Sequence, residues 1–486
     1  MAIILTVLAY FAVLFTVARL TSRRATNESF YRADRRSPWP MVAFGMVGAS
    51  ISGVTFVSVP GMVQTSQMTY LQLCLGFILG YVAVAFVLLP LYYRLNLTSI
   101  YTFLGQRLGR RAYLTGAWFF LLSKMTGAAL KFYVVCMVLQ QLVFTPAGIP
   151  FWLNAVLMVA LIWLYTHRGG IKTLVVTDTV QTVCLLTALL LIIYKVVGGL
   201  GLSPGEAVQA VADSPMSRVF VIGDWASPHN FWKQLLSGMF IVIVMTGLDQ
   251  DMMQKNLTCR TLRDAQKDMC SYGVAFVPVN LLFLSLGVLL TMLPATAGAT
   301  GDALLPAYVS SFLADGHSVA ASAGSFIPAI FTLGIVAASF STADSALTSM
   351  TTSYCVDIRQ QAHDEGLRKR THAVMCLLFV LFILLFHSVN STSLIDAIYT
   401  MVSYTYGPLL GLFAFGLFTR RTPADRYAPY IGIASPLLCF GADTLAQSLW
   451  GYRFGYELLM LNGMLTFCGL WISSLYTRSA GRRTPS

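Results

Sequence analysis

The sequence predicts an all-α integral membrane protein with about 13 transmembrane helices and a five-plus-five inverted-repeat core. The first observation is composition, since 56% of the 486 residues are hydrophobic and only 11% are charged, whereas soluble domains carry about 25% charged residues. The second is that apolar runs of about 18 residues or more recur along the chain. The third is a pair of glycine-interrupted apolar segments that lie five spans apart.

Each apolar run bounded by charged or turn residues is interpreted as one span. The predicted spans lie near residues 2–20, 39–64, 69–94, 112–144, 151–166, 171–199, 232–256, 270–294, 324–352, 371–389, 393–418, 427–448 and 455–477. No polar block between them is long enough to fold by itself, so we expect a single membrane domain over residues 1–486. We expect it to comprise an additional N-terminal helix (1–20), a first repeat (39–199), a second repeat (232–418) and two C-terminal helices (427–477).

The formal net charge of +12 is distributed unevenly between the two sides of the predicted membrane. With the first loop in the cytoplasm, most of the 32 Lys and Arg lie on that side, and the outer side holds only Lys195, Arg218, Lys233 and Arg453. The positive-inside rule then places the N-terminus outside and the C-terminus in the cytoplasm. Membrane topology therefore explains the basic excess, and we expect a lipid bilayer rather than nucleic acid as the partner.

Two spans contain glycines that interrupt the apolar run. The second span reads "MVAFGMVGASISGVTFVSVPGMV", with Gly45, Gly48 and Gly53, and its counterpart reads "FWKQLLSGMFIVIVMTGLDQDMM", with Gly238 and Gly247. Glycines can simply allow close helix packing. A broken helix, however, leaves unpaired backbone groups at membrane depth that must line a cavity or bind something. Two such segments at matching positions favour a binding site at the middle of the membrane.

The stretch "SFSTADSALTSM" places polar side chains on one face of an apolar helix. Ser341, Asp344, Ser345 and Thr348 are spaced at i, i+3, i+4 and i+7, so they face the same side. Hydroxyl groups in membrane helices often bond only to their own backbone, but an acid within the membrane indicates function. Mostly neutral oxygen ligands with one or two carboxylates suit a monovalent cation, and sodium is the natural candidate.

Three further charged residues lie inside predicted spans. Asp178, near the start of a span, suits either a hydrogen bond at a helix end or a cation site. Lys124 and Lys131 are seven residues apart and share a helix face. Buried lysines need an acid partner or an anionic ligand, so they are either counter-ions to Asp178 or Asp344 or contacts for an anionic substrate.

Other candidates for chemistry are not supported by the sequence. Asp249 and Asp251 lie near a predicted cytoplasmic end and are expected to be structural. No P-loop, HExxH or GxSxG pattern is found, and the nine Cys have no paired spacing. We therefore expect no enzymatic activity, no disulfide framework and no metal-thiolate site.

Four segments of the chain resemble the sodium:solute symporter family. They are "ASISGVTF", "GGIKTLVVTD", "GLDQDMMQKNL", and "AASFSTADSAL" followed by "VDI". The resemblance covers nearly the whole chain. It implies a LeuT-like core as in the bacterial members of the family. It also implies that the protein lies in the plasma membrane, here a bacterial inner membrane, and that sodium is the transported ion.

The resemblance also implies site residues, position by position. The main sodium site would comprise Gly48, Ile51, Ala338, Ser341 and Thr342, and a second cation site would add Asp178, Asp344 and Ser345 to Ser341. Substrate contacts would come from Ser50, Ser52, Thr55 and Gln72, with Lys124 or Lys131. The family usually has a hydroxyl or small residue where this chain has Asp344. Three roles for Asp344 therefore stay open: it binds sodium, it binds a proton, or it replaces the ion.

The resemblance implies secondary active transport of a small-molecule substrate by alternating access. Sugar-carrying members have an acid-amide pair where this chain has Val54 and Thr55, and an aromatic gate where it has Met245. Short hydroxyls beside a lysine suit a small organic anion better, such as a sialic acid or a monocarboxylate. The alternatives are proton-coupled symport through Asp344, and an amino-acid or sugar symporter of the same fold. The sequence leaves the oligomeric state open, and a monomer is compatible with it.

Overall fold

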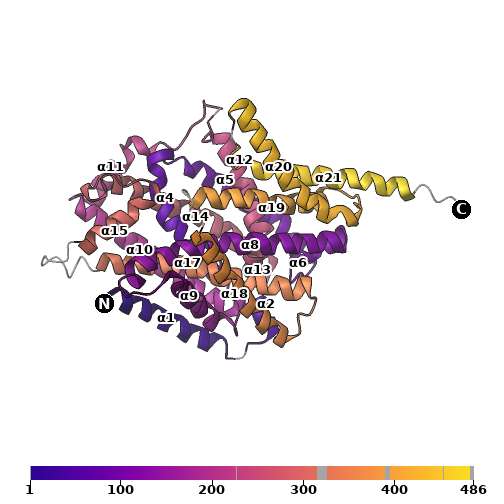
Figure 1. Cartoon of the computed structure of the whole chain (residues 1–486), viewed down its shortest axis with the longest axis horizontal. Coiled ribbons are helices and arrows are strands. Elements are labelled where there is room, and N and C mark those ends of the chain that lie inside the picture. Colours follow the sequence, from indigo (N-terminus) through magenta and orange to yellow (C-terminus); the bar gives the residue numbers. More distant parts are fainter. Residues whose placement is uncertain are drawn as a thin grey trace.

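The computed structural model describes residues 2–23, 25–225, 227–314, 326–388, 394–452 and 454–481, and the regular elements in these ranges are helices. The helices of the first half are α1 (Ala2–Thr21), α2 (Asn27–Arg32), α3 (Trp39–Ser50), α4 (Gly53–Ser66), α5 (Tyr70–Ala83), α6 (Leu89–Arg94), α7 (Thr102–Arg107), α8 (Arg110–Leu139), α9 (Phe151–Thr166), α10 (Ile171–Gly199) and α11 (Pro204–Ala212). Those of the second half are α12 (Phe231–Val242), α13 (Gln250–Asn256), α14 (Leu262–Thr291), α15 (Leu304–Ala314), α17 (Phe326–Ser353), α18 (Glu365–Ser388), α19 (Leu394–Phe418), α20 (Ala428–Trp450) and α21 (Leu458–Gly481). Figure 1 shows them as one bundle.

Short π-helical segments continue several of these helices. They are η2 (Val84–Leu88), η3 (Gln140–Phe144), η5 (Ile243–Gly247) and η8 (Tyr354–Ile358). Single-turn 3-10 segments occupy some of the connections, namely η1 (Ala33–Arg35), η4 (Pro215–Ser217), η6 (Pro294–Thr296), η7 (Gly301–Ala303) and η9 (Asp425–Tyr427).

The predicted all-helical membrane fold is confirmed. Among the described residues, nine helices are long and apolar enough to cross a membrane, and two bent pairs raise the number to 11. Two further predicted spans correspond to α9, which has only 16 residues, and to α20, a continuous helix that contains Pro436 and Asp443. The boundary predicted near residues 389–393 and the start of the span predicted at 324–352 lie outside the described residues.

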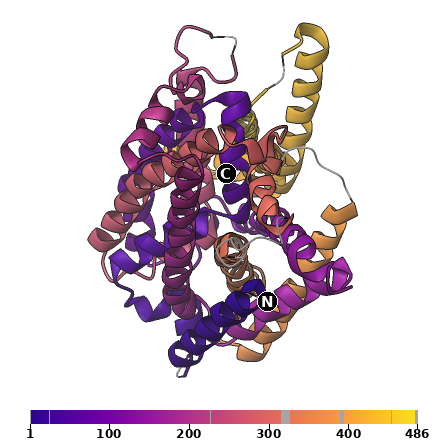
Figure 2. The same cartoon turned by 90° about the vertical axis from the view of Figure 1, so that its left-hand side faces the viewer.

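Helix α17 forms the centre of the bundle. It carries the polar stretch that includes Ser341 and Asp344, and 94% of its most apolar window is buried. Helices α10, α8, α3 and α1 pack against it. Figure 2 shows α1 on the outside of the bundle and the yellow C-terminal helices at the opposite edge. The cation-binding candidates of the sequence therefore lie at the best shielded position of the fold.

Both helices predicted to be broken are broken. The pair α3 and α4 bends by 63° between Ser50 and Gly53, and α12 with η5 bends by 70° from α13. At the first break, Ile51 and Ser52 have extended backbone conformations. At the second, Asp249 is extended and accepts a hydrogen bond from the Asp251 amide as the N-cap of α13. Each break leaves helix-terminal carbonyl groups in the interior of the bundle.

Gly48 allows α3 to approach α10 closely. A Cβ atom at Gly48 would lie 2.0 Å from Thr182 Oγ1 and 2.9 Å from Thr182 Cβ, which is too close for two packed helices. A side chain here would push the broken helix away from Asp178, one turn earlier on α10. The glycine thus holds the break against the buried carboxylate.

Substituting Gly48 by alanine is expected to lower the thermal unfolding temperature of the purified protein. Overpacking a tight contact typically costs about 1–3 kcal/mol. Gly198→Ala is the matched control, because Gly198 lies on α10 and a methyl group added there would meet no heavy atom within 4 Å. Alanine also favours a helix over glycine by up to about 1 kcal/mol. Equal melting temperatures of the two variants would contradict the close packing of α3 and α10.

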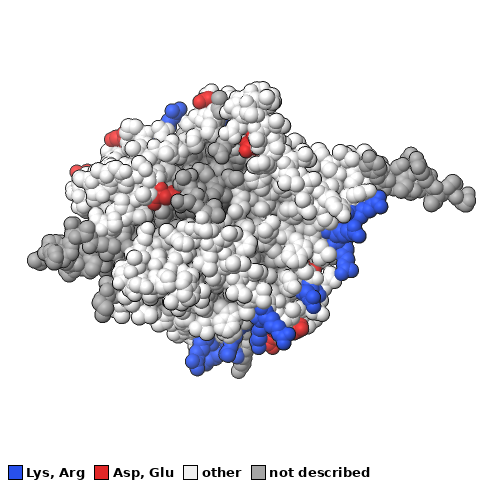
Figure 3. All heavy atoms as spheres, in the orientation of Figure 1, with Lys and Arg blue, Asp and Glu red and all other residues white. Residues whose placement is uncertain are grey.

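Basic and acidic side chains gather at different edges of the face shown in Figure 3. Figure 3 shows Lys and Arg along the lower and right-hand edge, while several Asp and Glu lie toward the upper left. This separation agrees with the asymmetry of the loops in the sequence. The direction of the two termini across the membrane stays a prediction.

Candidate functional site

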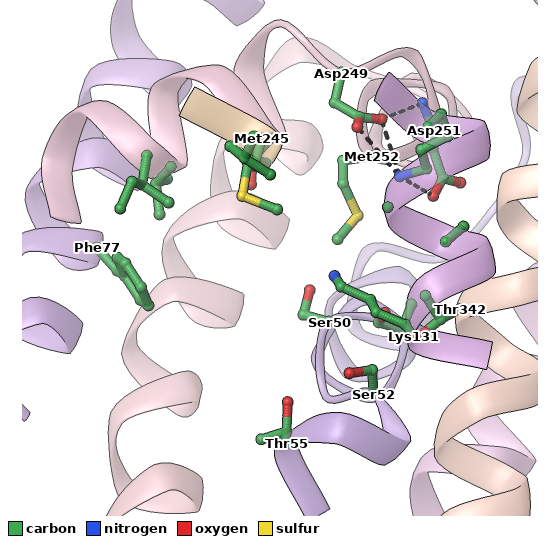
Figure 4. Close-up of a pocket in the computed structure, with 18 of the residues that line it drawn as sticks. Ser50, Ser52, Thr55, Phe77, Lys131, Met245, Asp249, Asp251, Met252 and Thr342 are labelled. Atoms are coloured by element: carbon green, nitrogen blue, oxygen red, sulfur yellow. Dashed lines mark hydrogen bonds and ion pairs between the residues drawn. The ribbon is translucent and has the colours of Figure 1, made fainter. Parts of the chain in front are cut away.

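A central cavity opens between the two helix breaks. Its wall contains five of the polar residues predicted to contact substrate: Ser50, Ser52, Thr55, Lys124 and Lys131. Thr342 of α17 and Asp249 and Asp251 of the second break also line it. The rings of Phe77, Tyr81, Tyr272 and Phe276 supply apolar surface. Figure 4 shows Lys131 reaching into this space above Ser52 and Thr55.

The first break offers oxygen ligands to a cation. No backbone amide in the described part of the chain donates to the carbonyls of Gly48, Ala49, Ser50 or Ile51. The Thr342 hydroxyl lies 3.1 Å from the Ala49 oxygen and 3.2 Å from the Ala338 oxygen, so it joins α17 to the break. These neutral oxygens have the chemistry of a monovalent hard-cation site. The structure thus brings Thr342 and Ala338 of α17 to the carbonyl end of α3, while the Ser341 hydroxyl donates to Asp178.

The carbonyls of the second break instead accept hydrogen bonds from tyrosines. Tyr92 Oη donates to the Gly247 oxygen at 2.8 Å, and Tyr101 Oη donates to the Leu248 oxygen at 2.9 Å. Both tyrosines are fully buried. Because their hydroxyls already satisfy these oxygens, the second break is less available to an ion than the first.

Asp178 is paired with a lysine that the sequence did not suggest. Its Oδ2 lies 2.7 Å from Lys255 Nζ, and its Oδ1 accepts a hydrogen bond from Ser341 Oγ at 2.6 Å. Asp178 and Lys255 are each 1% exposed. Of the two interpretations of Lys124 and Lys131, the one that makes them counter-ions of Asp178 is excluded, because Lys255 of α13 pairs with that carboxylate.

Asp344 lies in the same interior but has no cation within ion-pair distance among the described residues. Its Oδ2 accepts from Tyr165 Oη at 2.6 Å, and its Oδ1 accepts from Ser345 Oγ at 3.3 Å. The hydroxyl of Thr348, one turn further along, is buried without a hydrogen-bond partner in the described ranges. Lys124 and Lys131 are therefore not counter-ions of Asp344 either.

The two lysines of α8 have different surroundings. Lys124 Nζ lies 3.1 Å from Asp249 Oδ2 and 2.7 Å from Asp251 Oδ2. Tyr406 Oη also donates to Asp249 Oδ2, at 2.5 Å. Lys131, by contrast, makes no ion pair or hydrogen bond to any described residue. Of the two, Lys131 has its ammonium group available to a ligand.

Asp249 and Asp251 lie in a different place from the one expected. The sequence suggested a structural role near the cytoplasmic end, but both carboxylates line the central cavity. The reason is that the chain breaks at Leu248 and Asp249, which brings the start of α13 to the middle of the bundle. Asp251 Oδ1 is buried without a hydrogen-bond partner among the described residues, so it can accept from a ligand.

Ser50 belongs to a chain of hydroxyl groups at the cavity wall. Its Oγ is hydrogen-bonded to Tyr272 Oη, which accepts from Tyr81 Oη at 2.7 Å. The two tyrosine rings meet edge to face with centroids 4.5 Å apart. A ligand that contacts Ser50 would therefore also be linked, through these hydrogen bonds, to α14 and α5.

Gln72 does not line the cavity. Its Nε2 donates to the His229 oxygen at 2.9 Å, and its Oε1 accepts from the Val221 amide at 3.1 Å. Both polar ends of this buried side chain thus hold the loop before α12. The structure separates Gln72 from the other predicted substrate contacts, and we correct that assignment to a loop-anchoring role.

Sequence reasoning missed Lys255, Tyr165 and Tyr272. Lys255 follows "DQDMMQ" near the predicted cytoplasmic end of its span, where a cation is ordinary. The sequence alone does not show that the bend before it turns this lysine into the interior. The tyrosines carry no spacing pattern of their own. Only the unusually high share of buried acids in one region could have indicated that a buried cation must accompany them.

Comparison with known proteins agrees with this geometry. The model of the sodium:solute symporter family matches residues 30–425. The sodium/sialic acid symporter NanT of Aliivibrio fischeri is 26% identical over 94% of this chain and 91% of its own length. The human sodium/iodide cotransporter is 24% identical over 87% of this chain and 64% of its own. A solved structure of a Na⁺-coupled sialic acid symporter, in a substrate-bound outward-open state, has a TM-score of 0.79 and 19% identity over 98% of each chain. The match extends over most of the chain and includes both broken helices and α17, and the protein belongs to the sodium:solute symporter family.

Proposed function

We propose that this protein is a sodium-coupled symporter of a small organic anion, a sialic acid or a monocarboxylate. The observation that carries the proposal is the juxtaposition of two features at one cavity. The unpaired ammonium of Lys131 reaches into it, and Thr342, hydrogen-bonded to the open carbonyl of Ala49, forms part of its wall. The sodium/sialic acid symporter among its relatives supports the same class of substrate.

The substrate's carboxylate would pair with Lys131. In a buried site a charge-assisted hydrogen bond is roughly twice as strong as a neutral one. Donor groups of the substrate can bond to Asp251 Oδ1, which is unsatisfied in the described ranges, and hydroxyl groups can bond to Ser52 and Thr55. The polyhydroxylated body of a sialic acid uses this set more fully than a monocarboxylate does, so sialic acid is the first candidate.

Sodium would enter from outside and bind the first break together with α17. Its binding would fix α3 against α17 in the outward-open form and complete the substrate pocket at Thr342. A membrane potential of 100 mV supplies about 2.3 kcal/mol per charge, and a tenfold sodium gradient adds about 1.4 kcal/mol. Entry of a substrate with one negative charge is opposed by the potential to the same extent, so one sodium ion and one such substrate together carry no net charge. The tenfold sodium gradient alone then supports a substrate ratio of about tenfold.

The proposed arrangement in the cell follows the sequence. The protein would be a multi-pass protein of a bacterial inner membrane, with the N-terminus outside and the C-terminus in the cytoplasm, and one chain would contain the complete site. The concentration of basic side chains on one edge of the molecule supports this orientation.

A thermal-shift screen of the purified protein tests coupling and substrate class together. Sialic acids, monocarboxylates, amino acids and sugars are each added in sodium and in potassium at equal ionic strength. The proposal expects stabilisation by a sialic acid or a monocarboxylate in sodium and little in potassium. Stabilisation by amino acids or sugars alone would contradict the anion assignment, and equal shifts in both salts would contradict sodium coupling.

Replacing Lys131 by glutamine is expected to weaken the affinity for the anionic substrate about 10- to 100-fold. Hydrogen bonds to a charged group contribute about 1.5–3 kcal/mol, and this ammonium has no protein acid to pair with in the described part of the chain. The measurement is a substrate titration by thermal shift or calorimetry at saturating sodium. Lys131→Arg keeps the charge and should retain more affinity, whereas identical affinity of wild type and Lys131→Gln would exclude Lys131 as the anion contact.

Proton coupling through Asp344 is the alternative, favoured by the complete burial of its carboxylate without a cation at ion-pair distance in the described ranges. It expects uptake driven by an acidic exterior without sodium and loss of that response in Asp344→Asn. Sodium-dependent uptake that is insensitive to the pH gradient would exclude it.

A further inference from the structure

Three buried charged side chains lie next to the proposed sodium site. Asp178 of α10, Lys255 of α13 and Asp344 of α17 come from three different helices and are each at most 1% exposed. Two serines, Ser341 and Ser345, complete the polar group. If the protein is sodium-coupled, as proposed, this group bears on how many sodium ions bind in each transport cycle.

The lysine lies where oxygen ligands converge. Lys255 Nζ is 2.7 Å from Asp178 Oδ2, and the other oxygen of that carboxylate accepts from Ser341. Asp344 lies three residues after Ser341 on the same face of α17, so its carboxylate faces the same side of the helix as the serine that bonds to Asp178. A carboxylate pair with two hydroxyls is a suitable set of ligands for a monovalent cation, and here the ammonium group is already next to it.

The net charge of Asp178, Lys255 and Asp344 determines how many further cations the group can take. With both acids ionised, the group carries a net charge of −1, because Lys255 cancels one carboxylate. One monovalent cation bound nearby neutralises it completely. A second sodium would leave an excess positive charge in a water-poor interior, where an uncompensated ion is strongly unfavourable. Without Lys255, two cations would be needed for the same balance.

We infer that Lys255 is a tethered cation that takes the place of a second sodium ion beside Asp178, and that this protein binds a single sodium ion in each transport cycle. The covalently attached ammonium stays with the protein through the cycle. The coupling ion is then the one held at the first break by Ser341, Thr342 and the open carbonyls.

The test counts bound sodium with ²²Na⁺ alone, so that no substrate need be known. Purified wild type, Lys255→Met and Lys255→Arg are brought to equilibrium with ²²Na⁺ at saturating concentration, and the ions bound per protein are measured. One ion is expected for wild type and for Lys255→Arg, which keeps a cation in place. Two are expected for Lys255→Met, because sodium then compensates Asp178.

Each outcome has a separate meaning. No specific sodium binding by wild type would overturn the proposed function itself. Two ions in wild type, or one ion in a folded Lys255→Met variant, would overturn only the tethered cation. If Lys255→Met does not fold, the double variant Asp178→Asn with Lys255→Met removes both charges and is expected to bind one ion, and two ions there would also contradict the inference.

Discussion

Substitution of Thr342 by alanine is expected to raise the sodium concentration needed for half-maximal transport about 10- to 100-fold. The hydroxyl lies 3.1 Å from the open carbonyl of Ala49 and is one of the few side-chain oxygens that can join α17 to the break. Losing a hydrogen-bonding group beside a charge removes about 1.5–3 kcal/mol, which corresponds to this range. The sodium dependence of substrate uptake in proteoliposomes measures it, and Ser341→Ala with Thr342→Ala should remove sodium dependence altogether.

Ser349→Ala is the matched control for this experiment. Ser349 lies on the same helix and is 1% exposed, but its hydroxyl donates only to its own helix, at the Ala346 oxygen 3.0 Å away. The sodium dependence of this variant should equal that of wild type. Unchanged sodium dependence in the double variant at positions 341 and 342 would show that the ion binds elsewhere.

Substitution of Asp178 by alanine is expected to destabilise the protein by about 3–5 kcal/mol. The change leaves the ammonium of Lys255 buried without its partner, and removing one member of a buried ion pair has this effect. The measurement is the thermal unfolding of the purified protein in sodium-free buffer. Asp178→Asn combined with Lys255→Met should recover most of the loss, because two neutral groups then replace the pair.

A surface ion pair provides the comparison. Lys172 and Asp34 are 2.9 Å apart, but their side chains are 37% and 33% exposed. Asp34→Ala should therefore change stability by only about 0–1 kcal/mol. If Asp178→Ala were as mild as Asp34→Ala, or if the double variant were as unstable as Asp178→Ala, the pairing of Asp178 with Lys255 would not be energetically important.

The broken helices and the polar face of α17 could be predicted from the sequence alone. Gly48 and Gly53 flank the first break, and glycines that interrupt two apolar runs at matching positions are typical of broken transporter helices. Ser341, Asp344 and Ser345 share a face because the helix repeat requires it, and hydrocarbon cannot satisfy them. These are local rules, so they can be read from neighbouring residues.

Partners contributed by distant segments could not be predicted in this way. Lys255 follows Asp178 by 77 positions, and its direction depends on the 70° bend that precedes α13. Gln72 failed for a similar reason. The family resemblance implied a substrate contact at Gln72, yet the loop before α12 folds back and takes both of its polar groups. In both cases tertiary folding, not residue type, decided the partner.

Thr342 belongs at once to the wall of the central cavity and to the contact between α17 and the first break. A position shared in this way makes the two binding equilibria reciprocal. If bound sodium raises the affinity for the solute by some factor, bound solute must raise the affinity for sodium by the same factor. Each ligand thus retains the other until both can leave, which suppresses the slippage that would let sodium pass alone and dissipate its gradient.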